Sequence, residues 1–294
     1  MSNDDQLKVR QTVSKKKSFK ELTIVRDIIF WIDLVGEGQN ENAIFARPFN
    51  EKEAFPQKLT SKKYNIKNNF HGYGGKSYKC IYLKNNFYLI WIDQITNAVW
   101  FQIFKEVASN YRSQKRYLDS VQEPRQLSKS IVGNFDSSFV ISHKNFLYGI
   151  CEINNRDYLF SLNLKKTKQD IHRIKKFKNF AGELSSNTSI SLISWVEWDS
   201  PYMPWEKNDL CFAQIDLDGE ITKIKKFSDN LINAKKNVSF FQPYWISETL
   251  LVCSEDSSGW WNLLFLDASK IENIFIKKRV ERNFVEYGVP QWVS

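Results

Sequence analysis

Cysteine and histidine are scarce in this sequence. The 294 residues contain three histidines and four cysteines, and each cysteine stands alone within an apolar run. Neither a Cys-x-x-Cys pair nor a Cys/His cluster occurs, so the sequence offers no zinc site and no redox motif. We therefore predict no metal and no cofactor, and we expect buried free thiols at Cys80, Cys151, Cys211 and Cys253.

Long apolar runs are absent as well. Stretches such as Phe87–Ile92 are far too short to cross a bilayer. Residues 1–20 are polar and basic, and no apolar segment of the kind found in secretory signals follows them. We expect no membrane segment and a cytoplasmic location.

An apolar period of 3.6 residues is also missing, which argues against a helical solenoid. Aromatic residues make up 15% of the chain, and large rings suit pleated, half-buried surfaces. Short apolar runs alternate with polar turns almost to the end, which predicts an all-β fold. Asp218-Gly219 and Asn85-Asn86 are the expected hairpin turns, and Val107–Tyr117 is expected as a short helix or an exposed loop.

A weak repeat organises these strands. Several times an aromatic or apolar strand ends in a turn that bears Asp or Asn, and a second strand then returns. The strands of this kind are Tyr88–Asp93, Tyr158–Asn163, Cys211–Asp216 and Asn262–Asp267. The last three recur about every 50 residues, which is close to the length of a four-stranded β-propeller blade.

This repeat divides the chain. We predict a flexible arm at residues 1–18 and a β-propeller at residues 19–294. The approximate blades are expected at residues 20–65, 68–125, 126–180, 181–236 and 237–284, with the start of another at 285–294. The sequence leaves open whether the ring closes with five blades, stays open or is truncated.

The net charge of +9 raises the question of a polyanionic partner. Lysine-rich runs are scattered along the chain and mostly flank expected strand ends, where charge is solvated. These runs lie at residues 15–17, 165–168, 175–178, 223–226 and 277–279. No motif of an RNA- or DNA-binding fold accompanies them. We expect no nucleic-acid partner, with polyanion binding as the weaker alternative.

Specific motifs go beyond a generic propeller. They are residues 70–78 (FHGYGGKSY), residues 193–205 (ISWVEWDSPYMPW), and residues 241–245 (FQPYW) followed by 254–263 (SEDSSGWWNL). Together they resemble the N-terminal β-propeller of the bacterial acylaminoacyl-peptidase and dipeptidyl-aminopeptidase-like branch of the prolyl oligopeptidase family. Residues 124–128 (PRQLS) resemble a turn between blades in that family, and residues 287–293 (YGVPQWV) resemble a segment that leads into further blades. The similarity is collinear from near Leu22 to Ser294.

Some positions depart from the pattern of that family. Gly72 stands where the family has Glu in a His-Glu-Tyr-Gly-Gly motif, and Ser200 stands where the family has His. Residues 246–249 (ISET) replace a Ser-Pro-Asp-Gly turn. Substrate contacts of the first motif are therefore not carried over by the resemblance.

The resemblance implies one half of a two-part enzyme. In that family the propeller caps an α/β-hydrolase domain and admits short peptides, and a Ser-Asp-His triad with its Ser in a G-x-S-x-G elbow performs the chemistry. This sequence contains no G-x-S-x-G, and it lacks the strand–helix alternation of an α/β-hydrolase. We expect no enzymatic activity from the chain by itself.

The first candidate contact site for a peptide or a partner protein is formed by His71 and Tyr73. The adjacent Gly74-Gly75 would let a ligand backbone approach closely. A glycine bulge at the start of a strand is the simpler interpretation.

The second candidate site is the loop that follows Ile193–Val196. Its candidate residues are Glu197, Trp198, Asp199, Met203 and Trp205. The carboxylates, together with Glu206, would attract an α-amino group, and the alternative is a solvated strand edge. Strand alternation would place the two carboxylates of Glu197 and Asp199 on one face and Trp198 on the other. The loop is expected to face a hydrolase domain or the funnel of the propeller, or its rings simply pack over its own blade.

Three functions agree with this sequence. The first is a non-catalytic propeller that gates short peptides or binds a separate α/β-hydrolase domain or another protein. The second is the front part of a split or truncated peptidase whose catalytic domain is encoded elsewhere. The third is a decayed remnant, which the departures from the family pattern would fit.

Overall fold

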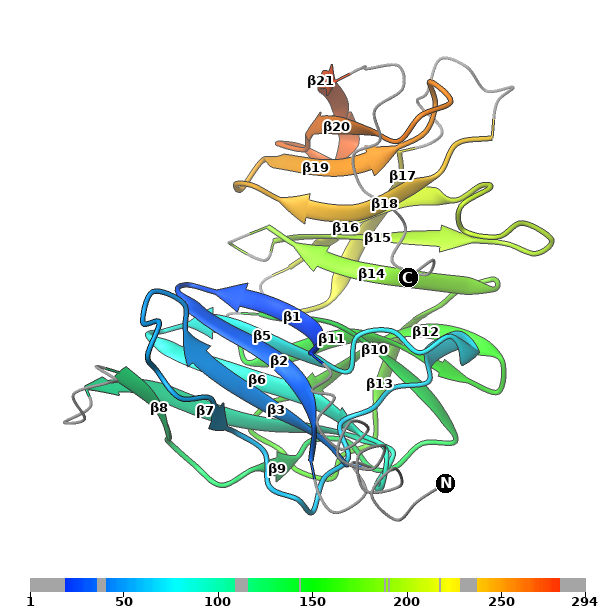
Figure 1. The fold of residues 1–294 in the computed structure, drawn as a ribbon. Coiled ribbons are helices and arrows are strands. Elements are labelled where there is room, and N and C mark those ends of the chain that lie inside the picture. The colour runs from blue at the N-terminus through cyan, green and yellow to red at the C-terminus, as the bar shows by residue number, and fades with distance from the viewer. Residues whose placement is uncertain are drawn as a thin grey trace, which may run out of the picture. The chain divides into compact units, whose positions relative to one another are not determined.

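The computed structural model describes residues 19–35, 41–108, 116–142, 144–187, 189, 191–216, 218–227 and 237–280. The predicted arm at 1–18 and the predicted start of another blade at 285–294 lie outside these residues. The described chain is built from antiparallel strands and two short 3-10 helices (Figure 1). The all-β prediction is confirmed.

The strands form five sheets in which consecutive strands are neighbours. The first sheet contains β1 (Lys20–Val25), β2 (Ile28–Val35), β3 (Glu41–Pro48) and β4 (Gln57–Lys58). The second contains β5 (Tyr78–Leu83), β6 (Asn86–Asp93), β7 (Ala98–Ala108), β8 (Arg116–Ser120) and, beside β7, β9 (Arg125–Gln126). The third contains β10 (Gly133–Ile141), β11 (Phe146–Ile153), β12 (Arg156–Asn163) and β13 (His172–Lys176).

The last two sheets continue the same pattern. The fourth contains β14 (Phe180–Ser186), β15 (Leu192–Trp198), β16 (Asp209–Ile215) and β17 (Ile221–Lys226). The fifth contains β18 (Phe240–Trp245), β19 (Leu250–Glu255), β20 (Asn262–Asp267) and β21 (Phe275–Val280). The 3-10 helices are η1 (Phe70–Gly72) and η3 (Ile271–Asn273).

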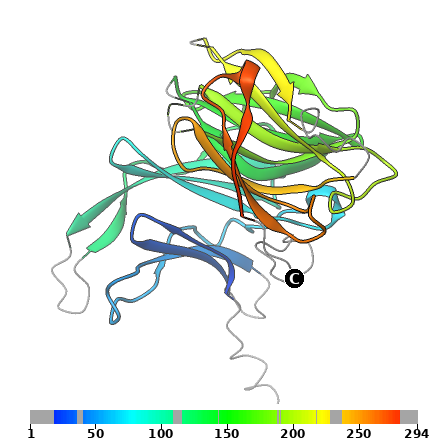
Figure 2. The same ribbon diagram turned by 90° about the horizontal axis from the view of Figure 1, so that it is seen from above.

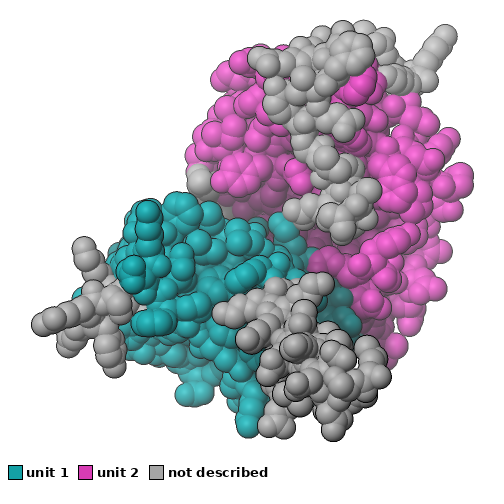
Figure 3. Space-filling model, in the orientation of Figure 1, with its two compact units in different colours: residues 1–68, 76–126 teal, residues 69–75, 127–294 magenta. Residues whose placement is uncertain are grey.

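Two compact units contain these sheets (Figure 3). Unit 1 comprises residues 1–68 and 76–126 and holds the first two sheets. Its core includes Phe30, Phe87 and Trp91. Unit 2 comprises residues 69–75 and 127–294 and holds η1 and the other three sheets. In unit 2 strand β14 lies beside both β10 and β18, and the three sheets overlap when seen from above (Figure 2), so they are stacked.

Turn chemistry explains most of the hairpins. The turn between β5 and β6 consists of Lys84 and Asn85, both with positive φ, because Leu83 pairs with Asn86. The predicted Asn85-Asn86 turn is thus displaced by one residue. The predicted turn at Asp218-Gly219 is present: Gly219 has a φ of 89° and its N–H donates to the carbonyl of Asp216.

The prediction of a short helix at Val107–Tyr117 is wrong for the residues described at the two ends of this segment, which are in strands. Strand β7 continues to Ala108, and β8 begins at Arg116. Val107 pairs with Tyr117 across this hairpin, and the Arg116 guanidinium forms ion pairs with Asp27, Glu51 and Glu106. Residues 109–115 lie outside the described residues. A polar edge hairpin has no clear apolar period, which is why its sequence was ambiguous.

Gly149 in β11 provides a test of packing in unit 2. A Cβ at Gly149 would lie 2.9 Å from ring atoms of both Phe139 and Phe160. We expect Gly149→Ala to lower the free energy of unfolding by about 1–3 kcal/mol through overpacking. The matched control is Gly182→Ala in β14, where the nearest atom to the added Cβ is 3.9 Å away. Urea denaturation measures both, and equal effects of the two variants would contradict this account.

Candidate functional site

His71 lies at a buried junction of unit 2. Its backbone is left-handed, with a φ of 51°, and it turns the imidazole inward from η1. The Nε2 atom lies 2.7 Å from Oδ2 of Asp157 in β12, and the two side chains are only 5% and 1% exposed. The neighbouring Tyr73 points outward and is 68% exposed. The structure therefore does not present these two side chains together to a ligand.

Asp157 has a second partner besides the imidazole. Its Oδ2 atom accepts the backbone N–H of Ala181 in β14 at 2.7 Å. Burial raises the pKa of the Asp157 carboxyl, and the hydrogen bond and charge of His71 oppose that effect. The rings of Phe180 and Trp198 meet the imidazole edge to face at 5.2 and 5.6 Å. The His71–Asp157 pair thus joins η1 to two of the sheets.

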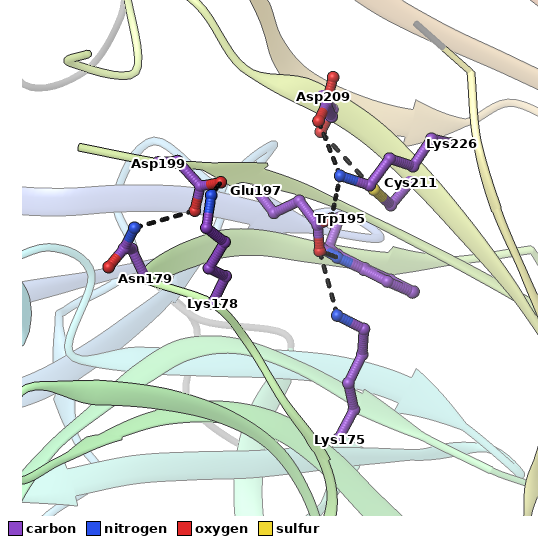
Figure 4. Close-up of polar contacts among 9 residues, drawn as sticks. All are labelled: Lys175, Lys178, Asn179, Trp195, Glu197, Asp199, Asp209, Cys211 and Lys226. Carbon is purple, nitrogen blue, oxygen red and sulfur yellow. Dashed lines mark hydrogen bonds and ion pairs between the residues drawn. The ribbon is translucent and has the colours of Figure 1, made fainter. Parts of the chain in front are cut away.

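Glu197 in β15 is enclosed by cations. Its carboxylate lies 2.8 Å from Nζ of Lys226 and 3.2 Å from Nζ of Lys175, and Trp195 donates its Nε1–H to it (Figure 4). The Glu197 side chain is 15% exposed. The interpretation as a solvated strand edge is wrong for this residue, because both its oxygens face lysines and its surroundings are largely dry.

Asp199 has a separate set of partners. It accepts hydrogen bonds from Lys178 Nζ at 2.7 Å and from Asn179 Nδ2 at 3.0 Å. Figure 4 shows the carboxylates of Glu197 and Asp199 engaged with different lysines. The third acidic residue, Glu206, accepts the backbone N–H of Met203 within its own loop. The three predicted carboxylates therefore do not converge on one point.

The ion pair of Glu197 recurs in the next sheet. Glu255 in β19 lies 2.9 Å from Nε of Arg279 in β21. The strand registers place Glu255 and Arg279 at the positions that Glu197 and Lys226 occupy in the preceding sheet. A pair that repeats from sheet to sheet belongs to the architecture rather than to a ligand site.

The side-chain amide of Asn208 holds the loop between β15 and β16 in place. The Asn208 side chain donates to the carbonyls of Pro204 and Phe240 at 2.8 and 2.9 Å and accepts the N–H of Phe240 at 2.8 Å. Trp198 is buried and stacks on Phe180, and Met203 is half-buried. Trp205 is 40% exposed. Among the candidate residues, Tyr73 and Trp205 present large aromatic surface to solvent.

Metal and thiol chemistry find no support in the described part of the chain. No group of three His, Cys, Asp or Glu residues there could hold a metal ion. The four cysteines are buried and unpaired, as expected, and burial raises the pKa of Cys80, Cys151 and Cys253. No helix within the described ranges is long and apolar enough to cross a membrane.

Solved structures of hydrolases share this architecture. A Mycobacterium tuberculosis puromycin-hydrolyzing peptidase matches with a TM-score of 0.72 and 16% identity, over 94% of this chain and 40% of that chain. A puromycin hydrolase matches with a TM-score of 0.73 and 17% identity, over 95% of this chain and 41% of that chain. The fold is a β-propeller. The resemblance drawn from the motifs is thus supported at the level of the fold, and its five described sheets are blades.

The propeller spans about two fifths of the length of these peptidases. No protein-family model and no curated protein sequence matches it. At 16–17% identity the likeness establishes the fold of the propeller and leaves its activity open.

Sequence reasoning missed Asp157 and Asn208. Asp157 follows a hairpin turn made by Asn154 and Asn155, and nothing in that local sequence indicates its bond to His71. Asn208 follows the aromatic loop without belonging to the motif. Both act through partners distant in sequence, and only an alignment of homologues carries a signal for such residues.

Glu197→Gln tests the buried ion pair. Burial by itself would raise the pKa of Glu197, but Lys226 and Lys175 lower it below its ordinary value. A lowered pKa in the folded state contributes stability above the unfolded value of about 4.3, and this contribution is lost as the pH falls through the folded pKa. We expect Glu197→Gln to cost about 1–3 kcal/mol at neutral pH and progressively less below pH ~4.

The measurement is urea denaturation of both proteins across this pH range. Asp170→Asn is the control, because the Lys129–Asp170 pair is exposed and should contribute nothing measurable. A cost for Glu197→Gln that does not change with pH would contradict the assignment.

Proposed function

We propose that this chain is a non-catalytic β-propeller that gates substrates for an α/β-hydrolase domain of the prolyl-oligopeptidase type. The observation that carries the proposal is the match to puromycin-hydrolysing peptidases over nearly the whole of this chain but only 40–41% of theirs. The remaining part of those proteins has no counterpart here. The proposal includes short peptides or aminoacyl amides as the gated substrates and a cytoplasmic location.

The chemistry of the chain supports a non-catalytic role. Its sequence has no G-x-S-x-G elbow. His71 is enclosed by aromatic rings and bonded to Asp157, which suits a structural pair. The candidate carboxylates are held by lysines of the propeller itself.

We expect exposed aromatic side chains of the propeller to contact the hydrolase domain. Tyr73 and Trp205 project from backbone that is fixed locally, by η1 and by the Asn208 side chain. Large rings on a rigid surface bind partners with little loss of conformational entropy. We expect a hydrolase domain to cover these two rings and the exposed ring of Tyr202.

A second candidate is the front part of one longer peptidase. This chain aligns with only 40–41% of each matched peptidase chain, and a hydrolase domain would account for much of the unmatched part. This coverage favours the second candidate. Reading the gene beyond the codon for Ser294 separates the two candidates. A G-x-S-x-G elbow in the same frame supports the single peptidase, and one in a neighbouring frame or gene supports a separate partner. If no G-x-S-x-G elbow is found in this gene or in the surrounding genes, both candidate functions are contradicted.

The test of the proposal has two parts. We expect the purified chain to leave puromycin and alanine p-nitroanilide intact, and to bind the hydrolase domain found by reading the gene. Trp205→Ala should weaken that binding by about 2 kcal/mol, or roughly 30-fold in Kd, as a central aromatic anchor does.

Tyr117→Ala is the matched control, because Tyr117 is a similarly exposed ring on β8 in unit 1. Calorimetry measures both variants. Turnover of either substrate by the chain alone, or failure to bind the hydrolase domain, would refute the proposal.

A further inference from the structure

Unit 2 contains a buried position with two carboxylates close together. Asp157 in β12 pairs across a hairpin with Glu152 in β11. The Asp157 side chain is 1% exposed, and Glu152 is half-buried. Carboxylates in such surroundings are costly to ionise unless a cation or N–H donors face them. The two side chains therefore need a partner that supplies positive charge or protons.

His71 is that partner in the structure. Its Nε2 atom lies 2.7 Å from Oδ2 of Asp157, and its backbone N–H donates to Oε2 of Glu152 at 3.3 Å. An ionised carboxylate only accepts hydrogen bonds, so Nε2 carries the shared proton. Burial raises the pKa of the Asp157 carboxyl, the hydrogen bond and charge of His71 lower it, and the charge of Glu152 raises it again. The imidazole thus offsets negative charge at this position.

Aromatic rings enclose the imidazole on its other sides. The ring centroids of Phe180 and Trp198 lie 5.2 and 5.6 Å from that of His71, and their planes are nearly perpendicular to it. Phe180 and Trp198 are stacked on each other, and Trp198 is 8% exposed. Aromatic walls beside a carboxylate are an arrangement that recognises organic cations, because both attract positive charge. The surroundings of His71 have this composition.

The imidazole reaches these surroundings from a segment outside the sheets. Residues 69–75, which we call the strap, belong to unit 2, although residues 68 and 76 belong to unit 1. The Asn68 side chain donates to the carbonyl of Lys76 at 3.0 Å and closes the strap into a loop at its base. Four residues of the strap have a positive φ, between 51° and 128°, and these are His71, Gly72, Gly74 and Gly75. The strap supplies the occupant, whereas strands β11, β12, β14 and β15 supply the carboxylates and the rings.

We propose that the carboxylates and rings around His71 form a binding site for an organic cation, which His71 occupies as an internal ligand. The residues of the site are Glu152, Asp157, Phe180 and Trp198. A protonated amine or an imidazolium with an apolar part fits it: the N–H group bonds to Asp157, and the apolar part lies between the rings. A free ligand enters when His71 leaves, so the strap makes an autoinhibitory contact.

Chemical rescue tests the site in the full chain. His71→Gly removes the internal ligand and suits the left-handed backbone at this position. Imidazole at about pH 6, where it is mostly a cation, should raise the melting temperature of this variant by about 3 °C at ten times its Kd. Pyrazole has the same shape but stays neutral, and it should raise the melting temperature far less. The wild-type chain, whose site is filled, should show no rise.

Two further variants locate the effect of imidazole. Asp157→Asn, added to His71→Gly, should abolish the rise, while it keeps an oxygen that accepts the N–H of Ala181. Leu159→Ala is the matched control, because it opens a cavity among buried apolar side chains of the same unit. Imidazole should not raise the melting temperature of Leu159→Ala.

A second comparison decides the matter if His71→Gly does not fold. His71→Lys restores a cation and should melt close to the wild-type chain, whereas His71→Leu, which fills space without charge, should melt several degrees lower. No rise with imidazole in a folded His71→Gly chain, an equal rise with pyrazole, in the wild-type chain or after Asp157→Asn, or equal melting of His71→Lys and His71→Leu would overturn the proposal. These outcomes are independent of any hydrolase partner.

Discussion

Neighbouring blades of a propeller share no ladder of backbone hydrogen bonds, so side chains must join them. In unit 2 this requirement is met by acceptors that reach the backbone of the next blade. Asp157 of β12 accepts the N–H of Ala181 in β14 while it holds His71 of η1. Such charge-assisted bonds in dry surroundings are strong and costly to break. Their positions therefore determine how consecutive blades of unit 2 stack.

Ion pairs with carboxylates of the sheets account for part of the basic charge. Lysines and arginines of the outer strands β17 and β21 neutralise carboxylates of the second strands within their own blades, as Lys226 does for Glu197 and Arg279 for Glu255. Lys175 of β13 reaches Glu197 in the following blade. Lys175 and Lys226, which belong to two of the basic runs, are thus engaged with carboxylates of the sheets.

The sheets were predictable from sequence because a period of two and turn residues are local signals. The repeat of Cys211–Asp216 and Asn262–Asp267 marks equivalent strands, and the structure places them as β16 and β20. The candidate site was less predictable. Whether Glu197 meets solvent or two lysines depends on strand registers and on an adjacent blade, and the bond between His71 and Asp157 spans 86 positions of sequence. Such contacts follow from the complete fold, which a single sequence does not specify locally.

His71, Asp157, Glu197 and Asp199 are engaged in contacts within the propeller itself. What its described surface offers are aromatic rings on fixed backbone, with Trp205 in a loop held by Asn208 and Tyr73 beyond η1. Rings of this kind contribute binding energy through desolvation and shape, without needing a titrating group. Polar pairs thus hold blades of unit 2 together, while these aromatic rings remain exposed.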